Sequence, residues 1–410
     1  MKKKIFIIVV GLFFLTLMIC MDFSDAQEQY VIGYQTDITG PGSSNMAPQA
    51  EGFKLYMQTL NDRGGIKGRR VNVIYEDDKS SPPRAGAIAT KFILEDKVLL
   101  IAGLSFSVSQ PPVFELAKKH NVPVVVPYSC PVAAYAPVEE DCRQVFATGP
   151  IMSPKFHYHG YAEALIVSKL FPKGSTIGSM SYGTPGGRIL SSWGAKWCEK
   201  RGYKVVYHED IPPGTVDVSS WVDKIVKANP DVLMPVLGGE ISVPLMTNLE
   251  KMGYNKPVLN ANYLNTDDFL KIGEGLIKPK ENLYIYSELA MPIAATPPKE
   301  YEEIQKAMKK YGHTYSLSAR HASGWLTAQV IEVALAKVGW PASRSALIEA
   351  LEKTDLVTKG LSGGPIRFNE TDHYGMAYVK AYRWDPFKKV MIDALDWQKF
   401  EPAKIAKETQ

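Results

Sequence analysis

A regular alternation of short apolar runs with amphipathic segments constrains the fold of this chain more than any other feature. Helix-like segments separate the first apolar runs, which lie at residues 30–34, 71–75, 98–102 and 122–126. Strands that alternate with helices form a parallel sheet, and the helices cover both of its faces. The sequence therefore predicts an α/β unit in this part of the chain.

The alternation begins again after Thr148-Gly149-Pro150 and continues through residues 266–272. The next section differs, because it holds two long helix-like segments, 298–311 and 319–338, and a strand-rich end with a hairpin at Asp385-Pro386. Two sheet units followed by extra helices and strands predict two lobes that share the C-terminal section. The chain then crosses between the lobes more than once, with candidate crossings at residues 148–153, 281–287 and 359–366.

The segment 1–26 has the features of an export signal. Three lysines precede the apolar residues 5–19, and Ser24 and Ala26 form a small-x-small cleavage site. We expect cleavage after Ala26. A membrane anchor and a lipoprotein attached through Cys20 are the alternatives, but the apolar run is shorter than the about 20 residues of a span, and bulky Ile19 precedes Cys20.

Cysteines follow the predicted cleavage site at positions 130, 142 and 198. Export places them in an oxidising compartment, so Cys130 and Cys142 are candidates for a disulfide. That bridge would close the loop 131–141 and contribute about 3 kcal/mol in the chain-entropy model. We expect Cys198 to be a small buried hydrophobe beside Trp197 on a helix.

Charge and motifs exclude several classes of protein. The formal net charge is +4, and no block of lysine or arginine resembles a nucleic-acid-binding stripe. The chain has no G-x-G-x-x-G after its first strand, no P-loop, no H-E-x-x-H and no G-x-S-x-G. His157 and His159 have no obvious third partner for a metal. We therefore expect no enzyme, no cofactor, no metal and no nucleic acid.

Polar residues follow the predicted strands of the first unit. In open parallel sheets, ligands bind beyond the carboxyl ends of the strands. The residues found there are Thr36, Asp37, Ser105, Ser107, Ser109, Tyr128 and Ser129. They offer hydroxyls and backbone amides rather than a catalytic group, which favours binding over catalysis.

Several short motifs, in a specific order, resemble one family over nearly the whole mature chain. The family is that of the exported leucine/isoleucine/valine-binding proteins of branched-chain amino acid ABC importers. The motifs are Ile32-Gly33, Thr39-Gly40-Pro41, Asn61-Asp62-Arg63-Gly64-Gly65-Ile66, Glu76-Asp77-Asp78, Val145-Phe146-Ala147-Thr148, Gly202-Tyr203-Lys204-Val205-Val206, Pro230-Asp231 and Gly363-Gly364-Pro365-Ile366-Arg367-Phe368.

The resemblance implies the type I periplasmic binding protein fold, with two Rossmann-like lobes, three hinge crossings and a solute clamped in the interlobe cleft. On this reading the N-terminal lobe comprises 27–149 plus 285–360, the C-terminal lobe 150–284 plus 361–400, and 401–410 form a tail. It also implies a monomeric periplasmic protein that closes on its solute and delivers it to a membrane permease.

The resemblance further implies a set of ligand-binding residues. Ser107 is similar to the hydroxyl that binds the solute carboxylate, and helix N-termini and loop amides suit that anion. The first lobe also contributes Asn45, Met46, Tyr128, Ser129 and Cys130, and the second contributes Tyr182, Gly183, Gly238 or Gly239, Glu240 and Asn262. Gly186 is an alternative to Gly183. For Ser107 a helix-capping role is the alternative, and Glu240 is open to a role at a helix start.

Asn262 departs from the family pattern. Amino-acid binders of the family place an acid near this position to pair with the α-ammonium of the solute. A buried ammonium without a charged partner costs several kcal/mol. Either Glu240, or less favourably Asp267, takes that role, or the solute is an aromatic or aliphatic carboxylate without an ammonium. A sensor module that presents such a solute to a receptor is the alternative to an uptake protein.

Overall fold

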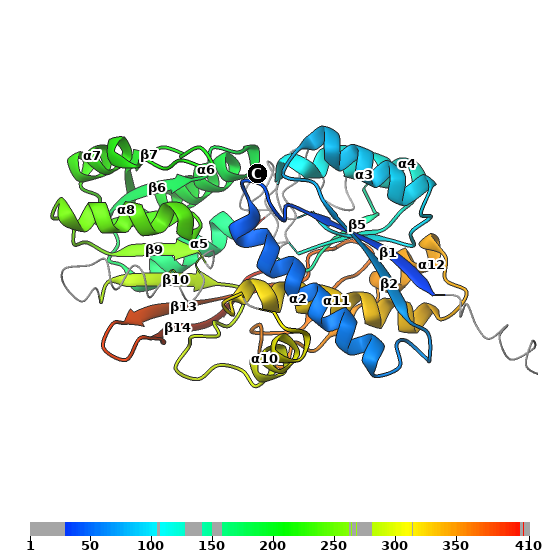
Figure 1. The fold of residues 1–410 in the computed structure, drawn as a ribbon. Helices are drawn as coiled ribbons and strands as arrows, with labels where there is room; N and C mark the ends of the chain where they lie inside the picture. The colour runs from blue at the N-terminus through cyan, green and yellow to red at the C-terminus, as the bar shows by residue number, and fades with distance from the viewer. Residues whose placement is uncertain are drawn as a thin grey trace, which may run out of the picture.

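The computed structural model describes residues 29–104, 107–127, 142–149, 158–261, 264, 268, 281–313, 315–401 and 405. Two β-sheets lie side by side, each flanked by helices, and together they give the mixed α/β architecture that the sequence predicts (Figure 1). We call the five-stranded sheet with its helices the first lobe and the seven-stranded sheet with its helices the second lobe.

The first sheet is parallel throughout, in the strand order β2-β1-β3-β4-β5. Gly33 at its centre is required by space, because a Cβ there would lie 2.4 Å from the ring of Phe92 on a covering helix. The strands are β1 (Tyr30–Thr36), β2 (Val71–Asp77), β3 (Ile101–Gly103), β4 (Val124–Val126) and β5 (Val145–Ala147), and the helices are α2 (Ser43–Asp62), α3 (Pro82–Leu94), η1 (Ser107–Ser109) and α4 (Gln110–His120).

The second sheet has the order β14-β13-β10-β9-β8-β6-β7. Its strands from β10 to β7 are parallel, whereas β13 and β14 form the predicted hairpin and pair antiparallel. The strands are β6 (Thr176–Ser181), β7 (Lys204–His208), β8 (Val232–Val236), β9 (Val258–Ala261), β10 (Leu283–Ser287), β13 (Tyr378–Asp385) and β14 (Val390–Lys399), and the helices are α5 (Tyr158–Leu170), α6 (Pro185–Lys200), α7 (Ser219–Ala228) and α8 (Gly239–Lys251).

The C-terminal helices α10 (Glu300–Tyr311), α11 (Ala319–Val338) and α12 (Arg344–Leu351) belong with the first lobe, where α11 runs beside α2 (Figure 1). The two helices approach closely through glycines: a Cβ on Gly52 would lie 2.0 Å from the carbonyl of His321, and one on Gly324 would lie 1.9 Å from that of Gln49. A short ladder of β11 (Asp355–Leu356) and β12 (Ile366–Arg367) follows.

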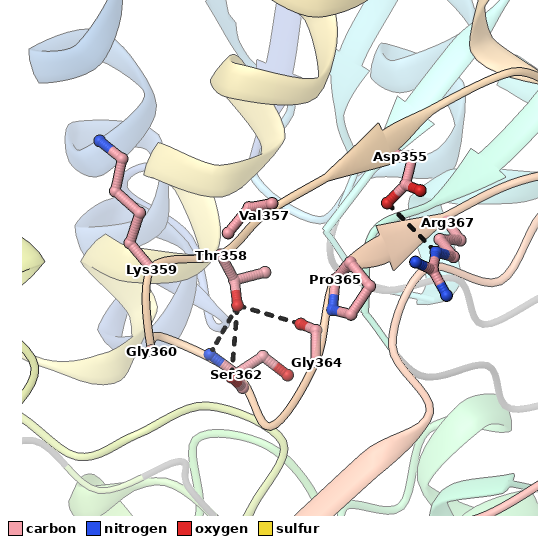
Figure 2. A pocket seen from close by; sticks show the side chains of 9 residues that line it. All are labelled: Asp355, Val357, Thr358, Lys359, Gly360, Ser362, Gly364, Pro365 and Arg367. Carbon is pink, nitrogen blue, oxygen red and sulfur yellow. Dashed lines mark hydrogen bonds and ion pairs between the residues drawn. The ribbon is translucent and has the colours of Figure 1, made fainter.

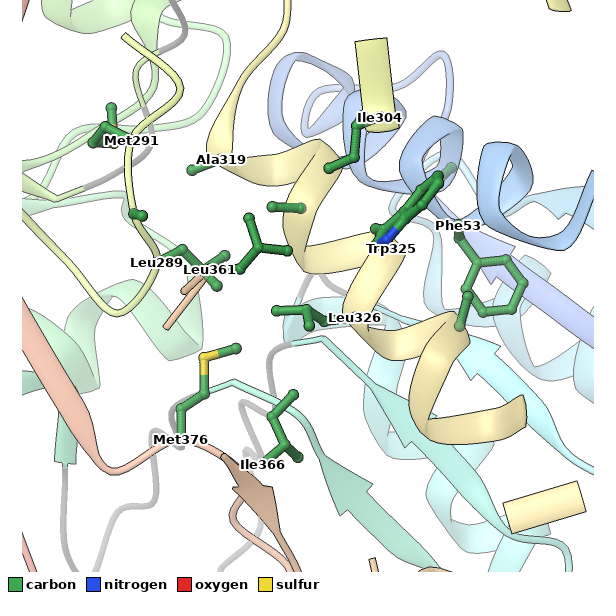
Figure 3. Packing of buried hydrophobic residues seen from close by; sticks show 14 of the residues in the cluster. Phe53, Leu289, Met291, Ile304, Ala319, Trp325, Leu326, Leu361, Ile366 and Met376 are labelled. Carbon is green, nitrogen blue, oxygen red and sulfur yellow. The ribbon is translucent and has the colours of Figure 1, made fainter. Parts of the chain in front are cut away.

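The segments that link the lobes share an apolar core. Figure 3 shows Trp325 and Leu326 of α11 packed in one cluster with side chains from other parts of the chain, namely Leu289, Met291, Leu361, Ile366 and Met376. Leu289 follows β10, which lies in the second sheet, and Leu361 and Ile366 lie in the third predicted crossing. The packing fits a shared C-terminal section, while the proposed lobe boundaries stay a prediction.

Most predicted elements are present, with shifted ends. β1 extends to Thr36, beyond the apolar run 30–34, and the helix predicted over 298–311 begins at Glu300. Cys198 is buried on α6, as expected. Within the described residues, none of the helices is long and apolar enough to span a membrane. The predicted export signal lies outside the described residues.

Candidate functional site

The loop between β1 and α2 is held by carboxylates that accept backbone hydrogen bonds. Asp37 accepts from the N–H of Gly40 at 2.5 Å and of Gly42 at 2.7 Å, and the hydroxyl of Ser80 donates to it as well. Asp78 is buried beside this loop and accepts from the N–H of Ser80 at 2.8 Å, and burial raises its pKa to about 6. These bonds fix the start of α2.

The start of α2 meets the second lobe at a polar junction that we call the Glu240 contact. The hydroxyl of Ser44 donates to Glu240 Oε2 at 2.9 Å, and the hydroxyl of Tyr182, after β6, donates to Glu240 Oε1. The N–H of Gly238 in turn donates to the Tyr182 hydroxyl at 2.7 Å. Glu240 and Ser44 are exposed, so this junction lies at the rim of the region between the lobes.

Gly238 marks the tightest approach within this contact. A Cβ on Gly238 would lie 2.6 Å from Glu240 Oε2, 2.7 Å from the Tyr182 hydroxyl and 2.8 Å from Asn45 Nδ2. Three polar groups from two lobes therefore converge on one glycine. Asn45 and its neighbour Met46 are buried, at 4% and 5% exposure.

A second junction, the Ser107 contact, lies where two helix starts meet. The N–H of Gly186, in the first turn of α6, donates to the Ser107 hydroxyl oxygen at 3.3 Å. Ser107 is buried and begins η1, which leads directly into α4. Thr184 caps α6 by accepting from the N–H of Gly187 at 3.1 Å. Helix N-termini carry partial positive charge, so this junction suits an anion.

At this junction Gly186 donates its N–H to Ser107, whereas the backbone groups of Gly183 bond within the second lobe. The N–H of Gly183 donates to the carbonyl of Ile211 at 2.8 Å, and its carbonyl accepts from Arg188 at 2.7 Å. Both backbone groups of Gly183 are thus used within the second lobe. The ligand-binding role predicted for Gly183 stays a prediction. That role would consist of van der Waals contact, because the backbone N–H and carbonyl of Gly183 already form hydrogen bonds.

Asp268 is a residue that sequence reasoning missed. A Cβ on Gly239 would lie 2.1 Å from the carboxyl carbon of Asp268, so this buried carboxylate lies directly against the residue before Glu240. The sequence pointed to Asp267, one position earlier. Contact with a glycine leaves no signal in a sequence, because the neighbour of a missing Cβ is set only by packing.

Several predicted residues lie outside the described residues, namely Tyr128, Ser129, Cys130 and Asn262. Their ligand-binding roles stay predictions. Cys142, the predicted partner of Cys130, is buried, and the disulfide between them also stays a prediction.

A separate pocket lies at the third predicted crossing, with a volume of about 660 Å³ (Figure 2). The Thr358 hydroxyl lies 3.2 Å from the carbonyl of Ser362 and 3.0 Å from that of Gly364, and it accepts from the Ser362 N–H at 3.3 Å. Asp355 pairs with Arg367 across the ladder at 3.1 Å. These bonds hold the loop between β11 and β12 in shape, so its polar groups have a structural explanation.

The chain is similar to known proteins over most of its length. The family model described as "Periplasmic binding protein" matches residues 29–389. A Leu/Ile/Val-binding protein homolog of Brucella melitensis is 21% identical over 373 residues, which cover 90% of this chain and 95% of the relative.

Two solved structures share the fold. A branched-chain amino acid ABC transporter protein from Thermus thermophilus with bound valine has a TM-score of 0.80 at 14% identity, with 94% of this chain and 99% of that chain covered. An ABC transporter solute-binding protein from R. palustris in complex with benzoate has a TM-score of 0.75 at 17% identity, with 91% and 98% covered.

Proposed function

Because this chain belongs to the periplasmic binding protein family, whose members bind solutes, we propose that it is the exported solute-binding component of an ABC importer. Its solute is a small carboxylate, either an amino acid or a related aromatic or aliphatic acid. The chain binds the solute between its two lobes and delivers it to the membrane permease. The observation that carries this proposal is the Ser107 contact.

The Ser107 contact suits a carboxylate for reasons of charge and hydrogen bonding. Two helix N-termini, η1 leading into α4 and α6, meet there from different lobes. An inserted carboxylate oxygen accepts from the Ser107 hydroxyl and from the Gly186 N–H in place of their mutual bond. Hydrogen bonds to a charged acceptor are stronger than the neutral bond that they replace. No cationic side chain is needed.

Closure follows from the same arrangement. A solute that touches both lobes favours the closed state by as much as its affinity for that state exceeds its affinity for the open one. The bond from Ser44 to Glu240 forms only when the lobes are together, because Ser44 belongs to one lobe and Glu240 to the other. A permease that recognises the closed lobes then receives loaded protein.

A panel of solutes tests the proposal directly. Branched, aromatic and polar amino acids are compared with benzoate-like and fatty acids by thermal shift, where a ligand at 100 times its Kd adds about 2.7 kcal/mol of stability. We expect at least one carboxylate to raise the melting temperature, and Ser107→Ala to weaken its binding. Equal affinity in Ser107→Ala would remove the carboxylate from this junction.

An amino acid is the solute favoured by the acids near Gly238 and Gly239. Glu240 lies at the junction and Asp268 lies against Gly239, so a solute ammonium placed there would face negative charge. Glu240→Gln separates the two solute classes: we expect it to weaken binding of amino acids and to leave nitrogen-free carboxylates much less affected. An equal loss of affinity for amino acids and for nitrogen-free carboxylates would show that Glu240 contributes to closure and not to recognition of the ammonium.

A further inference from the structure

The side-chain carbonyl of Asn45 is buried, and none of the described residues donates a hydrogen bond to it. Asn45 is the third residue of α2 and is 4% exposed. Its Oδ1 accepts no hydrogen bond from any residue that the structure describes. A buried amide oxygen without a partner costs free energy comparable to a lost hydrogen bond, so such oxygens are rare unless something else supplies the donor.

This oxygen lies at the junction of the two lobes. The amide nitrogen of Asn45 would be 2.8 Å from a Cβ on Gly238, which belongs to the second lobe. Because the oxygen belongs to the same small planar amide, it lies at that junction too.

The donors of the Glu240 contact already have acceptors. The hydroxyls of Ser44 and Tyr182 both donate to Glu240, and the N–H of Gly238 donates to Tyr182. The protein's own groups near Gly238 thus satisfy Glu240 and Tyr182 while the Asn45 oxygen has no described donor.

We propose that Asn45 selects solutes that carry a hydrogen-bond donor, an O–H or N–H group, in addition to their carboxylate. The inference rests on the proposed function. In the open protein, water reaches the Asn45 oxygen, and closure removes that water. A hydroxyl or ammonium on the solute then takes its place, whereas a plain carboxylate leaves the oxygen unpaired and closes the lobes less readily.

Matched pairs of solutes test this selectivity by isothermal titration calorimetry on the mature protein. Leucine is compared with 4-methylpentanoate, and 4-hydroxybenzoate with benzoate, since each pair differs in one donor group. We expect the member with the donor to bind about tenfold or more tightly in at least one pair. The pair that shows the preference identifies whether the donor is an ammonium or a hydroxyl.

Two substitutions distinguish the role of the Asn45 oxygen as an acceptor from the role of the side chain's shape. Asn45→Leu removes the oxygen at similar volume, and we expect the ratio of Kd values within the pair to fall toward one, chiefly because the plain acid binds more tightly. Asn45→Asp keeps an acceptor, and we expect it to keep the preference. Melting of the unliganded variants checks that both fold.

The outcomes are distinct. Equal affinity within both pairs for the unsubstituted protein would overturn the inference without any variant. A preference of unchanged size in Asn45→Leu would overturn it as well, because the Asn45 oxygen would then contribute nothing to the selectivity. An equal loss for both members of a pair would also overturn it, because Asn45 would then act only by its shape. Failure of all four acids, and of the wider carboxylate panel, contradicts the proposed function and this inference with it.

Discussion

The two junctions between the lobes differ in the charge that they present. At the Ser107 contact, the described polar groups are a neutral hydroxyl and a backbone N–H at helix starts, which together attract an anion. At the Glu240 contact, a carboxylate accepts hydroxyls from both lobes, beside a buried amide oxygen. One end of the region between the lobes thus suits an acid, and the other suits a donor.

A buried carboxyl group lies behind each junction, and the two groups differ in pKa. The larger of the two pKa shifts gives the largest predicted effect on stability. Glu163 on α5 lies against Gly194 of α6, the helix whose start forms the Ser107 contact, and burial raises the pKa of Glu163 to about 8. Asp78, behind the Glu240 contact, has a pKa of about 6. Each is protonated in the fold at a pH where the unfolded chain is ionised.

The direction in which stability changes with pH follows from the number of protons that the folded and unfolded states bind. Between the unfolded pKa and the raised folded pKa, the native state binds more protons, so stability falls as pH rises through that window and levels off above the folded pKa. We expect Glu163→Gln to remove this loss, with a gain over the unsubstituted protein that grows from pH 5 to pH 8 and reaches roughly 3–5 kcal/mol.

Urea unfolding at a series of pH values measures this gain. Asp78→Asn is the comparison, and its pH-dependent change in stability should level off above pH 6 and be smaller in size. A difference between Glu163→Gln and the unsubstituted protein that stays constant from pH 5 to pH 8 would show that Glu163 is ionised in the fold.

The next effect concerns space at the Glu240 contact. Gly238 has an extended backbone that any residue adopts, so Gly238→Ala adds only a methyl group, which meets Glu240, Tyr182 and Asn45. Glu240 and Tyr182 lie on the same lobe as Gly238, whereas Asn45 lies on the other, so the clash with Asn45 arises only on closure. That clash costs about 2 kcal/mol, a factor of about 30 in solute affinity. Gly183→Ala is the matched comparison, because its nearest atoms are 3.6 Å away. Similar losses in the two variants would show that space at Gly238 does not limit closure.

These junctions show what the sequence can and cannot predict. The alternation of apolar runs and amphipathic segments predicted both sheets, because a parallel strand that is buried on both faces consists mainly of apolar residues, and the sequence shows these directly. Ser107, Tyr182 and Glu240 were predicted because they follow strands in a family-like order. The contact of Asp268 with Gly239 and the bond from Gly186 to Ser107 depend on packing between segments distant in the chain, and no local sequence pattern records that packing.

Ser107→Ala probes the anion end alone. The Ser107 hydroxyl donates to the proposed carboxylate, and a hydrogen bond to a charged group contributes about 1.5–3 kcal/mol. We expect Ser107→Ala to weaken every carboxylate by about tenfold or more, whatever its other groups, in calorimetric titrations. A loss confined to amino acids would move the carboxylate away from Ser107 and reverse the assignment of the two ends.

Ser44→Ala should have the smallest effect. Its bond to Glu240 is exposed, and such a bond contributes about 0.5–1 kcal/mol. Removing it leaves the Tyr182 bond to Glu240 in place, so we expect a two- to fivefold loss of affinity that is the same for all solutes, because Ser44 favours closure without touching the solute. Small-angle scattering of the unliganded variant should show a larger share of open molecules. A loss that depends on the solute would place Ser44 in the binding site, and the Glu240 contact would then recognise the solute through both lobes.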